Sequence, residues 1–552
     1  MKNQKENGRS VEDTDKRNHK AGGKRMKKAV MVILAGILVI GSLAACGTDA
    51  DTNDVKKNAA ANVSSIEEGE GKGAKSENAS DEIVEIVWQY PSPGSLGVGF
   101  QDVENAINEK MEADIGVHVT FEPVELMESQ QKALLMITSG EQLDIVLSAF
   151  TSIGPLVSSN SIIPLTELAD KYGQDMVADG IELSKGYYNG ELYGIPPIES
   201  KGRAYGYILK TEYLDKYGIE VDEDKYYTLD DLEEIFEIIK AGEGDNFYCC
   251  IPANMTPEPA ANGYVEYDKI GGSLADGVIM LNKSFDNLTV TNFFETEEYR
   301  GYAEKMYEWA QKGYIAADAA VTTETNDTLI PSSHYLGNFY WGEDFERAIY
   351  ENTAKTPMTT LKMLDGYVVN GGGAGCQWSI SANCEYPDKA MQALNYLYHN
   401  YDVNMLVQYG LEGVSYEISE ETEDGIQIKY LAEDTASLPY FNPYGLWGNQ
   451  FNYPAVYPLE PGLGKEKHKF SEGIPKERYS AAMGYNFNQE PVSSQIAAVE
   501  TVIAQYTPSL NCGALDPAKA LPEFIESLKA AGIDTIIEEN QRQLDEWAAS
   551  NK

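Results

Sequence analysis

Side chains that could carry out catalysis are scattered through this 552-residue chain. There is no H-E-x-x-H pair of zinc ligands and no G-x-S-x-G nucleophile motif. The chain has 87 Asp and Glu residues, so a pair of glycosidase-like carboxylates can be drawn by chance. The histidines are His19, His118, His334, His399 and His468. Because none is spaced as metal ligands are, the sequence predicts neither an enzyme nor a cofactor site, and it does not decide whether a calcium ion binds.

Aromatic residues are the chemically distinctive group, with 36 Tyr, 15 Phe and 6 Trp in an acidic, polar chain. Flat rings stack on the C–H faces of sugars, while carboxylate and amide side chains bond the sugar hydroxyls. This composition favours carbohydrate binding. The alternative is that the rings pack in cores, and we expect this of Trp88, Trp309 and Trp547, which lie in strand or helix patterns.

The cysteines favour neither a disulfide framework nor a zinc ribbon. Five follow Cys46, an odd number without C-x-x-C spacing: Cys249, Cys250, Cys376, Cys384 and Cys512. A bridge between Cys376 and Cys384 stays open, but we expect buried free thiols.

The N-terminal segment is patterned as an export signal. Four basic residues precede an apolar run at 29–40 and the small residues Gly41 and Ser42. The run is shorter than the 18 or so apolar residues that favour a membrane-spanning anchor, the alternative interpretation. The sequence Leu43-Ala44-Ala45-Cys46 resembles the lipobox of bacterial lipoproteins, in which the leader is removed before a cysteine that receives diacylglycerol. We therefore expect a signal peptide at 1–45 and lipidation at Cys46, with either Met1 or Met26 as the start.

The charge of the chain limits its partners. Its net charge of −44 repels nucleic acid and anionic membrane surfaces, which bind through cations. Residues 46–80 contain almost no large apolar side chains, so this stretch cannot bury enough surface to fold and is expected to be a flexible spacer. About 470 residues follow, enough for two or three domains.

The elements after residue 82 must position any binding groups, and strand and helix patterns alternate there. Strands are predicted at 83–88, 117–121 and 143–147, and helices at 101–113, 126–137, 228–240, 297–311, 388–398 and 521–549. The first five of these elements in chain order predict a mostly parallel, doubly wound α/β sheet. Ligands of such sheets bind beyond the carboxyl ends of the strands, where Tyr90 and Phe150 follow the first and third strands. A capping box of Thr228 and Asp231 is expected to open the helix at 228–240.

Several short segments, in order, resemble the extracellular solute-binding proteins of carbohydrate ABC transporters (family 1-like). They are SGEQLDIV at 139–146, the stretch from Ile163-Pro164-Leu165 to Tyr172-Gly173, NGELYGIP at 189–196, LKTEYL at 209–214, and Gly371-Gly372-Gly373 followed by QWSIS at 377–381. Further segments at 409–413, 447–451, 531–534 and 541–544 are similar to a Firmicute lipoprotein subfamily with an extended C-terminal domain of unassigned function.

The resemblance implies a two-lobed, type II periplasmic-binding-protein-like α/β fold, each lobe a mostly parallel sheet flanked by helices. Lobe one is expected to comprise residues 82–200 and about 375–435. Lobe two is expected to comprise 201–374 and about 436–552, including the C-terminal extension.

The resemblance also implies a function. The chain is expected to be a monomeric, lipid-anchored receptor on the extracellular face of a Gram-positive cell membrane, which captures an oligosaccharide and delivers it to ABC permease subunits. The expected ligand-binding residues are Tyr90, Asp144, Phe150, Trp341, Trp378 and Trp447. For Asp144 the alternative is that its carboxylate caps neighbouring backbone. A peptide-binding receptor, a surface-anchored glycan-active enzyme and a structural surface lipoprotein are the remaining alternatives.

Overall fold

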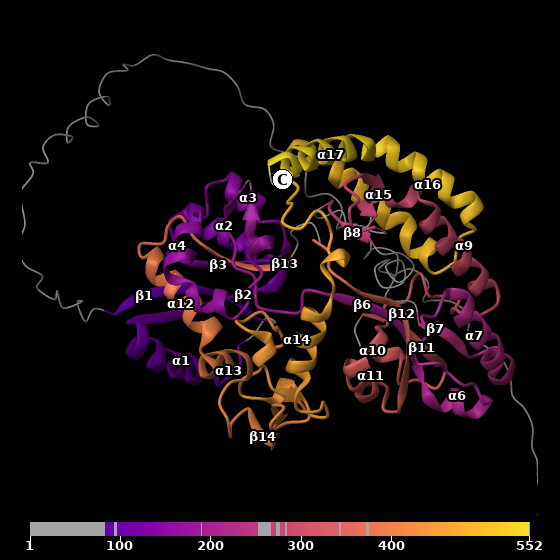
Figure 1. Cartoon of the computed structure of the whole chain (residues 1–552), viewed down its shortest axis with the longest axis horizontal. Helices are drawn as coiled ribbons and strands as arrows, with labels where there is room; N and C mark the ends of the chain where they lie inside the picture. The colour runs from indigo at the N-terminus through magenta and orange to yellow at the C-terminus, as the bar shows by residue number, and fades with distance from the viewer. Residues whose placement is uncertain are drawn as a thin grey trace, which may run out of the picture. The chain divides into compact units, whose positions relative to one another are not determined.

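The structure is a computed structural model that divides into two units, Met1–Asn78 and Ala79–Lys552. It describes residues 83–92, 96–188, 190–251, 267–271, 277–281, 284–341, 344–370 and 375–550 (Figure 1). The predicted signal peptide, Cys46 and the spacer lie outside these residues. Within them, no helix is both long enough and apolar enough for a membrane crossing.

A four-stranded sheet with the order β13-β3-β1-β2 organises the first lobe. Its strands are β1 (Val84–Ser92), β2 (Val117–Glu125), β3 (Ile145–Thr151) and β13 (Gly375–Ile380). β1 is parallel to β2 and β3, as predicted, whereas β13 returns antiparallel to β3. The strands therefore bring a segment from beyond residue 370 beside the N-terminal βαβ units.

Helices cover both faces of this sheet. Alternate residues of β3 are therefore buried on opposite sides of it. Ile145 and Leu147 join one apolar cluster, while Val146 packs with Ala133 and Ile137 of α2 (Ser129–Ser139) in another. The other helices are α1 (Phe100–Ile115), α3 (Gly154–Ser158), α4 (Thr166–Tyr172), α5 (Gln174–Ala178), α12 (Pro387–His399) and α13 (Tyr401–Tyr409). Figure 1 shows α2 and α3 on one side of the sheet and α1 and α13 on the other.

The second lobe contains a four-stranded sheet with the order β12-β6-β11-β7. Its strands are β6 (Arg203–Lys210), β7 (Tyr248–Ile251), β11 (Tyr335–Trp341) and β12 (Met358–Tyr367). β11 is parallel to β7, but β6 is antiparallel to both β11 and β12. The predicted mostly parallel arrangement is wrong for this sheet, because the central β6 runs opposite to both of its neighbours.

Helices α6 (Thr211–Tyr217), α7 (Leu229–Glu243) and α9 (Glu297–Gln311) belong to this lobe. The predicted capping box is present at the start of α7: Thr228 accepts a hydrogen bond from the Asp231 amide, and the Asp231 carboxylate accepts one from the Thr228 amide. Three residues of α7, Leu232, Phe236 and Ile239, are fully buried. The helix thus begins at a local sequence signal and is held by its apolar face.

Three C-terminal helices complete the second lobe: α15 (Ser493–Asn511), α16 (Pro517–Ala531) and α17 (Ile533–Ser550). They pack on one another and α15 and α16 pack on α9, as the yellow ribbons of Figure 1 show. The single helix predicted at 521–549 is divided between α16 and α17. Gly532, with φ of 102°, ends α16, and a side chain at this backbone angle is strained.

Smaller elements complete the described chain. They are β4 (Tyr187–Tyr188), β5 (Glu191–Leu192), β8 (Tyr267–Lys269), β9 (Val278–Leu281), β10 (Val290–Asn292), α10 (Asn326–Leu329), α11 (Arg347–Ala354), β14 (Tyr416–Glu421), β15 (Ile426–Tyr430), β16 (Ala455–Val456) and α14 (Leu463–Gly473). Strands β8 to β10 form one small antiparallel sheet, and β14 to β16 form another three-stranded sheet.

The two large apolar clusters divide the C-terminal third differently from the predicted boundary near 435. Tyr440 and Trp447 are buried in the cluster of the first sheet, whereas Cys512 and Phe524 belong to that of the second. The chain after 435 therefore begins in the core of the first lobe.

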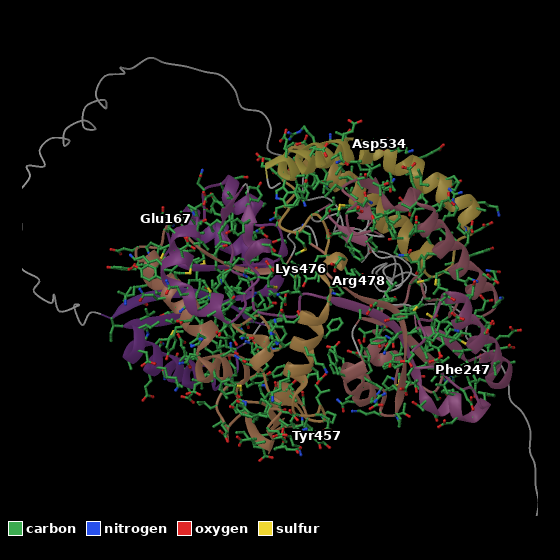
Figure 2. All side chains as sticks on the ribbon, in the orientation of Figure 1. Glu167, Phe247, Tyr457, Lys476, Arg478 and Asp534 are labelled. Atoms are coloured by element: carbon green, nitrogen blue, oxygen red, sulfur yellow. The ribbon has the colours of Figure 1, made fainter. Side chains whose placement is uncertain are left out.

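Hydrogen bonds between main-chain groups, and one from a side chain, tie the segments that join the two sheets. Ile195 and Trp378 exchange two of these bonds. Ile198 donates to the Gly448 carbonyl oxygen and accepts from the Gln450 amide. Arg478, labelled in Figure 2, donates from Nε to the Gly366 carbonyl oxygen at 2.6 Å. These bonds hold the joining segments against β12 and β13.

Candidate functional site

The carboxyl edge of the first sheet opens into a cavity of about 610 Å³, here called the strand-end cavity. Its lining residues are Gln130, Thr151, Ser152, Gly154, Pro155, Ser158, Ser159, Phe487, Asn488, Gln489, Glu490 and Ser493. Of the first seven, Thr151 ends β3 and the other six follow β2 or β3, at the edge where α/β sheets bind their ligands. The others come from the C-terminal segment, so residues more than 300 positions apart meet here.

Eight of the twelve lining residues carry a hydroxyl or amide side chain. Gln130 donates from Nε2 to the Ser152 carbonyl oxygen at 2.8 Å, which holds its side chain beside the cavity. The buried Thr151 hydroxyl at the end of β3 has no hydrogen-bond partner among the described residues, and neither has the Ser92 hydroxyl at the end of β1. Since an unpaired buried hydroxyl costs about 1–3 kcal/mol, a ligand or a closing movement that supplies partners is favoured.

Phe150 lies at the same edge and has an unusual backbone. Its φ of 54° is in the left-handed region, which bulky residues rarely adopt, and its side chain is 56% exposed. Strain of this kind concentrates at functional sites. Among the six predicted ligand residues, Phe150 is the one whose ring the structure shows to be accessible.

A larger cavity of about 1020 Å³ shares Asn488 with the strand-end cavity and is called the α17 cavity. Its lining residues are Glu182, Leu183, Ser184, Tyr187, Gly190, Met483, Gly484, Tyr485, Asn486, Asn488, Pro491, Glu539, Arg542, Gln543, Glu546, Trp547 and Ser550. Aromatic rings beside amides and carboxylates are the side chains that bind sugars. The volume is in the range of small-molecule sites.

The sequence interpretation missed this second cavity. Trp547 was expected to pack in a core, and its ring does contact Tyr485, but the residue is only partly buried and lines the α17 cavity. Trp88 and Trp309 are fully buried, as expected. One pattern in the sequence could have indicated it. Helical spacing places Trp547 on the same face as Glu539, Arg542, Glu546 and Ser550, so this ring lies among polar side chains.

A narrow pocket beside the segments that join the sheets is too small for a solute. It is lined by Pro196, Ile198, Val368 and Tyr479 among others, and its volume is about 20 Å³. That is room for about one water molecule.

Three of the predicted ligand residues are buried together in the first lobe. Trp378 and Trp447 are both 0% exposed, and Tyr90 is 3% exposed. Tyr90 stacks on Trp447, and its hydroxyl lies 2.8 Å from that of Tyr440. Burial raises the pKa of the Tyr90 phenol. In this arrangement the three rings pack in the core, and their ligand contacts stay predictions.

Asp144 caps the backbone, as its alternative interpretation held. Its Oδ2 accepts hydrogen bonds from the Val87 amide at 2.7 Å and from Gln142 Nε2 at 3.0 Å. The residue is 2% exposed. A ligand role for Asp144 stays a prediction. Trp341 is the last residue of β11, and its side chain lies outside the described part of the structure, as does Cys46.

The remaining groups offer neither a metal site nor a disulfide within the described residues. No group of three His, Cys, Asp or Glu side chains there is arranged to hold a metal ion. Cys376 and Cys384 are free thiols, as are the other three described cysteines. Burial raises the pKa of the Cys376 thiol to about 12, so it stays protonated at neutral pH.

The sequence of this chain matches those of known proteins. The sequence profile described as "Bacterial extracellular solute-binding protein" matches residues 106–414, and that of a domain of unknown function (DUF3502) matches 481–549. A carbohydrate ABC transporter substrate-binding protein of Streptococcus pneumoniae is 22% identical over 488 residues, which cover 87% of this chain and 94% of the relative.

Solved structures show the same two-lobed fold. The N-glycan transport solute binding protein of S. pneumoniae superposes with a TM-score of 0.70 at 20% identity, over 85% of this chain and 100% of that one. Its complex with Man1GlcNAc gives a TM-score of 0.62 at 19% identity, over 84% and 99% of the two chains. Its complex with Man5GlcNAc gives 0.60 at 20% identity, over 85% and 99%.

Proposed function

We propose that this chain, which belongs to the family of bacterial extracellular solute-binding proteins, captures an oligosaccharide and delivers it to the permease of an ABC importer. The observation that carries the proposal is the strand-end cavity at the carboxyl edge of β3 together with the α17 cavity, which shares Asn488 with it. The two are lined by hydroxyl, amide and aromatic groups. The complexes of the N-glycan transport solute binding protein with Man1GlcNAc and Man5GlcNAc support the choice of ligand class.

The physical task needs no covalent chemistry. A ligand that contacts both walls of the cavities binds the closed arrangement of the lobes more tightly than the open one, so it shifts the population toward closure. The closed form then presents a surface that the permease distinguishes from the empty receptor. The hydroxyls of Thr151 and Ser92 are shielded from solvent in this conformation and have no partner among the described residues, so a ligand or a movement that supplies one is favoured.

The test is isothermal titration calorimetry of the purified full chain with Man5GlcNAc, Man1GlcNAc, kestose and peptides of similar length. We expect heat with at least one glycan, none with the peptides, and a higher Tm in its presence, since ligand at 100 times Kd stabilises by about 2.7 kcal/mol. Heat with peptides alone would make the chain a peptide receptor. Cleavage of a glycan during the titration, read by mass spectrometry, would make it an enzyme.

The chain is also proposed to act as a monomer tethered to the outer face of the membrane through lipid on Cys46. The support is the export-signal pattern before that cysteine and the polar stretch after it. In fractionated cells, the wild-type chain is expected in the membrane fraction and Cys46→Ser in the medium. Equal membrane retention of both would contradict the lipid anchor.

A further inference from the structure

Helix α17 contributes to the lining of the α17 cavity, as do residues 182–184, Tyr187 and Gly190 of the first lobe. The helix contributes Glu539, Arg542, Gln543, Glu546, Trp547 and Ser550. Asp534, labelled in Figure 2, lies in its first turn and marks the opposite end of the helix. Five of these six lining residues fall within the domain of unknown function, which spans 481–549; Ser550 follows it directly.

Trp547 is held by a rigid neighbour. Its ring packs against Tyr485 with centroids 5.8 Å apart and an angle of 62° between the planes. Tyr485 is 1% exposed, and its hydroxyl donates to Asn540 Oδ1 at 2.7 Å. Because Tyr485 is fixed in this way, the Trp547 ring is supported in one orientation while it lines the cavity.

The next turn of α17 is also preorganised. Gln543 accepts from the Asn488 amide at 2.9 Å and donates to the Asn488 carbonyl oxygen at 3.0 Å. Asn486, two residues earlier, donates from Nδ2 to the Tyr187 carbonyl oxygen of the first lobe. These bonds connect α17, the segment 486–488 and the first lobe around one space.

Polar atoms of the lining still have unused bonding capacity. Ser184 Oγ and Asn486 Oδ1 are buried and have no hydrogen-bond partner within the described part of the chain. Each would be satisfied by a hydroxyl group that enters when the cavity closes. The space therefore suits a ligand rich in hydroxyls.

The charges of the cavity disfavour an anionic ligand. Glu182, Glu539 and Glu546 outnumber Arg542. The guanidinium is already engaged, since it donates two bonds to Glu539, at 2.9 and 2.6 Å, and one to Glu546 at 2.6 Å. The hydrogen bonds from Arg542 lower the pKa of the Glu539 carboxyl to about 2, so it is a carboxylate at neutral pH.

We infer that the α17 cavity is a subsite for a neutral sugar unit, which stacks on Trp547 and extends the ligand from the strand-end cavity. The domain of unknown function is then a ligand-binding element of the receptor. This inference rests on the proposed function and names the chemistry of its ligand: uncharged hexose or N-acetylhexosamine units, and not uronates or sialic acids.

Calorimetry of the full chain with Man5GlcNAc and Man1GlcNAc tests the stacking contact. We expect Trp547→Ala to weaken Man5GlcNAc binding about fivefold or more, as the loss of an aromatic contact does, with a smaller effect on Man1GlcNAc. Trp547→Phe, which retains a ring and its packing on Tyr485, controls for misfolding and is expected to bind within about threefold of the wild type. If Trp547→Ala weakens Man5GlcNAc binding by less than about fivefold, the subsite is overturned. If it weakens the binding of both glycans equally, the α17 cavity is the primary site, and the inference that it extends the ligand from the strand-end cavity is overturned.

Calorimetry with charged and neutral glycans tests the charge selectivity of the α17 cavity. The same measurements also distinguish a failure of the subsite from a failure of the proposed function. A sialylated N-glycan is expected to bind about tenfold or more weakly than its neutral counterpart, and Glu546→Gln to narrow that gap. Equal affinity for the two glycans overturns the neutral subsite. If the wild type binds no glycan at all, the proposed function fails first; if glycans bind and Trp547→Ala has no effect, only the subsite fails.

Discussion

Trp378 and Trp447 pack against each other in the core of the first lobe, with ring centroids 4.7 Å apart and an angle of 32° between the planes. Both are 0% exposed. Trp378 lies on β13, and its Nε1 donates to the Leu446 carbonyl oxygen at 3.2 Å, next to Trp447 in the chain. The pair therefore joins the segment near 447 to the sheet of the first lobe.

Trp447→Ala is expected to lower the free energy of unfolding by about 3–5 kcal/mol, because it leaves a large cavity in a packed core. Urea denaturation followed by circular dichroism measures this loss. Trp447→Phe keeps a ring and should lose less than half as much. If Trp447→Ala unfolds at the wild-type urea concentration but binds Man5GlcNAc more weakly, the ring is a ligand contact and the packing interpretation is wrong.

Asp144→Ala is expected to destabilise the fold by about 1–3 kcal/mol, since the buried Val87 amide loses its acceptor. Asp144→Asn keeps a side-chain oxygen that can accept this bond, so it should cost less. Chemical denaturation compares the two. A wild-type stability for Asp144→Ala would contradict the capping role, and weaker glycan binding by a stable Asp144→Asn would restore the ligand role.

Phe150→Gly is expected to stabilise the fold by about 0.5–1 kcal/mol, because it removes the cost of a side chain at φ of 54°. The exposed ring contributes little to the core, so its loss should not offset this gain. Phe150→Ala, which removes the ring but keeps the strained Cβ, is the matched control. Calorimetry should show that both variants bind Man5GlcNAc more weakly than the wild type. Wild-type affinity in both would remove Phe150 from the site.

Glu233 gives the second lobe a stability that depends on pH. Burial raises the pKa of this α7 carboxyl, but hydrogen bonds from Lys312, Lys305 and Trp309 outweigh burial and lower it from 4.5 to about 2. The stabilisation is complete above pH 4.5, where the carboxylate is charged in both states, and it is lost as pH falls toward 2. The wild type should therefore be more stable than Glu233→Gln at pH 7, by a margin that shrinks between pH 4.5 and 2.

Denaturation of both proteins across that range measures the margin. Glu297→Gln is the control, because the Glu297 side chain is 83% exposed and its ion pair with Arg300 is long, at 3.9 Å. This control should differ little from the wild type at any pH. A margin for Glu233→Gln that stays constant from pH 7 to pH 2 would contradict the linkage.

Local signals in the sequence predicted much of the fold. The apolar run at 83–88, the helix at 101–113 and the capping box at Thr228 depend on neighbouring residues, so their outcome could be read without tertiary contacts. The order of the motifs also indicated the family, which the match at 106–414 confirmed. The antiparallel β6 and the helix break at Gly532 were missed, because a strand's direction and a helix's end depend on backbone geometry as well as on periodicity.

The sequence by itself determined the first strands and several helices, the acidic charge and an aromatic composition typical of sugar binding. Only the tertiary structure decided which rings face a cavity. Tyr90 is buried because Tyr440, 350 residues later, meets its hydroxyl, and Trp547 lines a cavity because Tyr485 supports it from one side. A side chain's exposure depends on segments that folding brings together from distant positions, and no local pattern records that encounter.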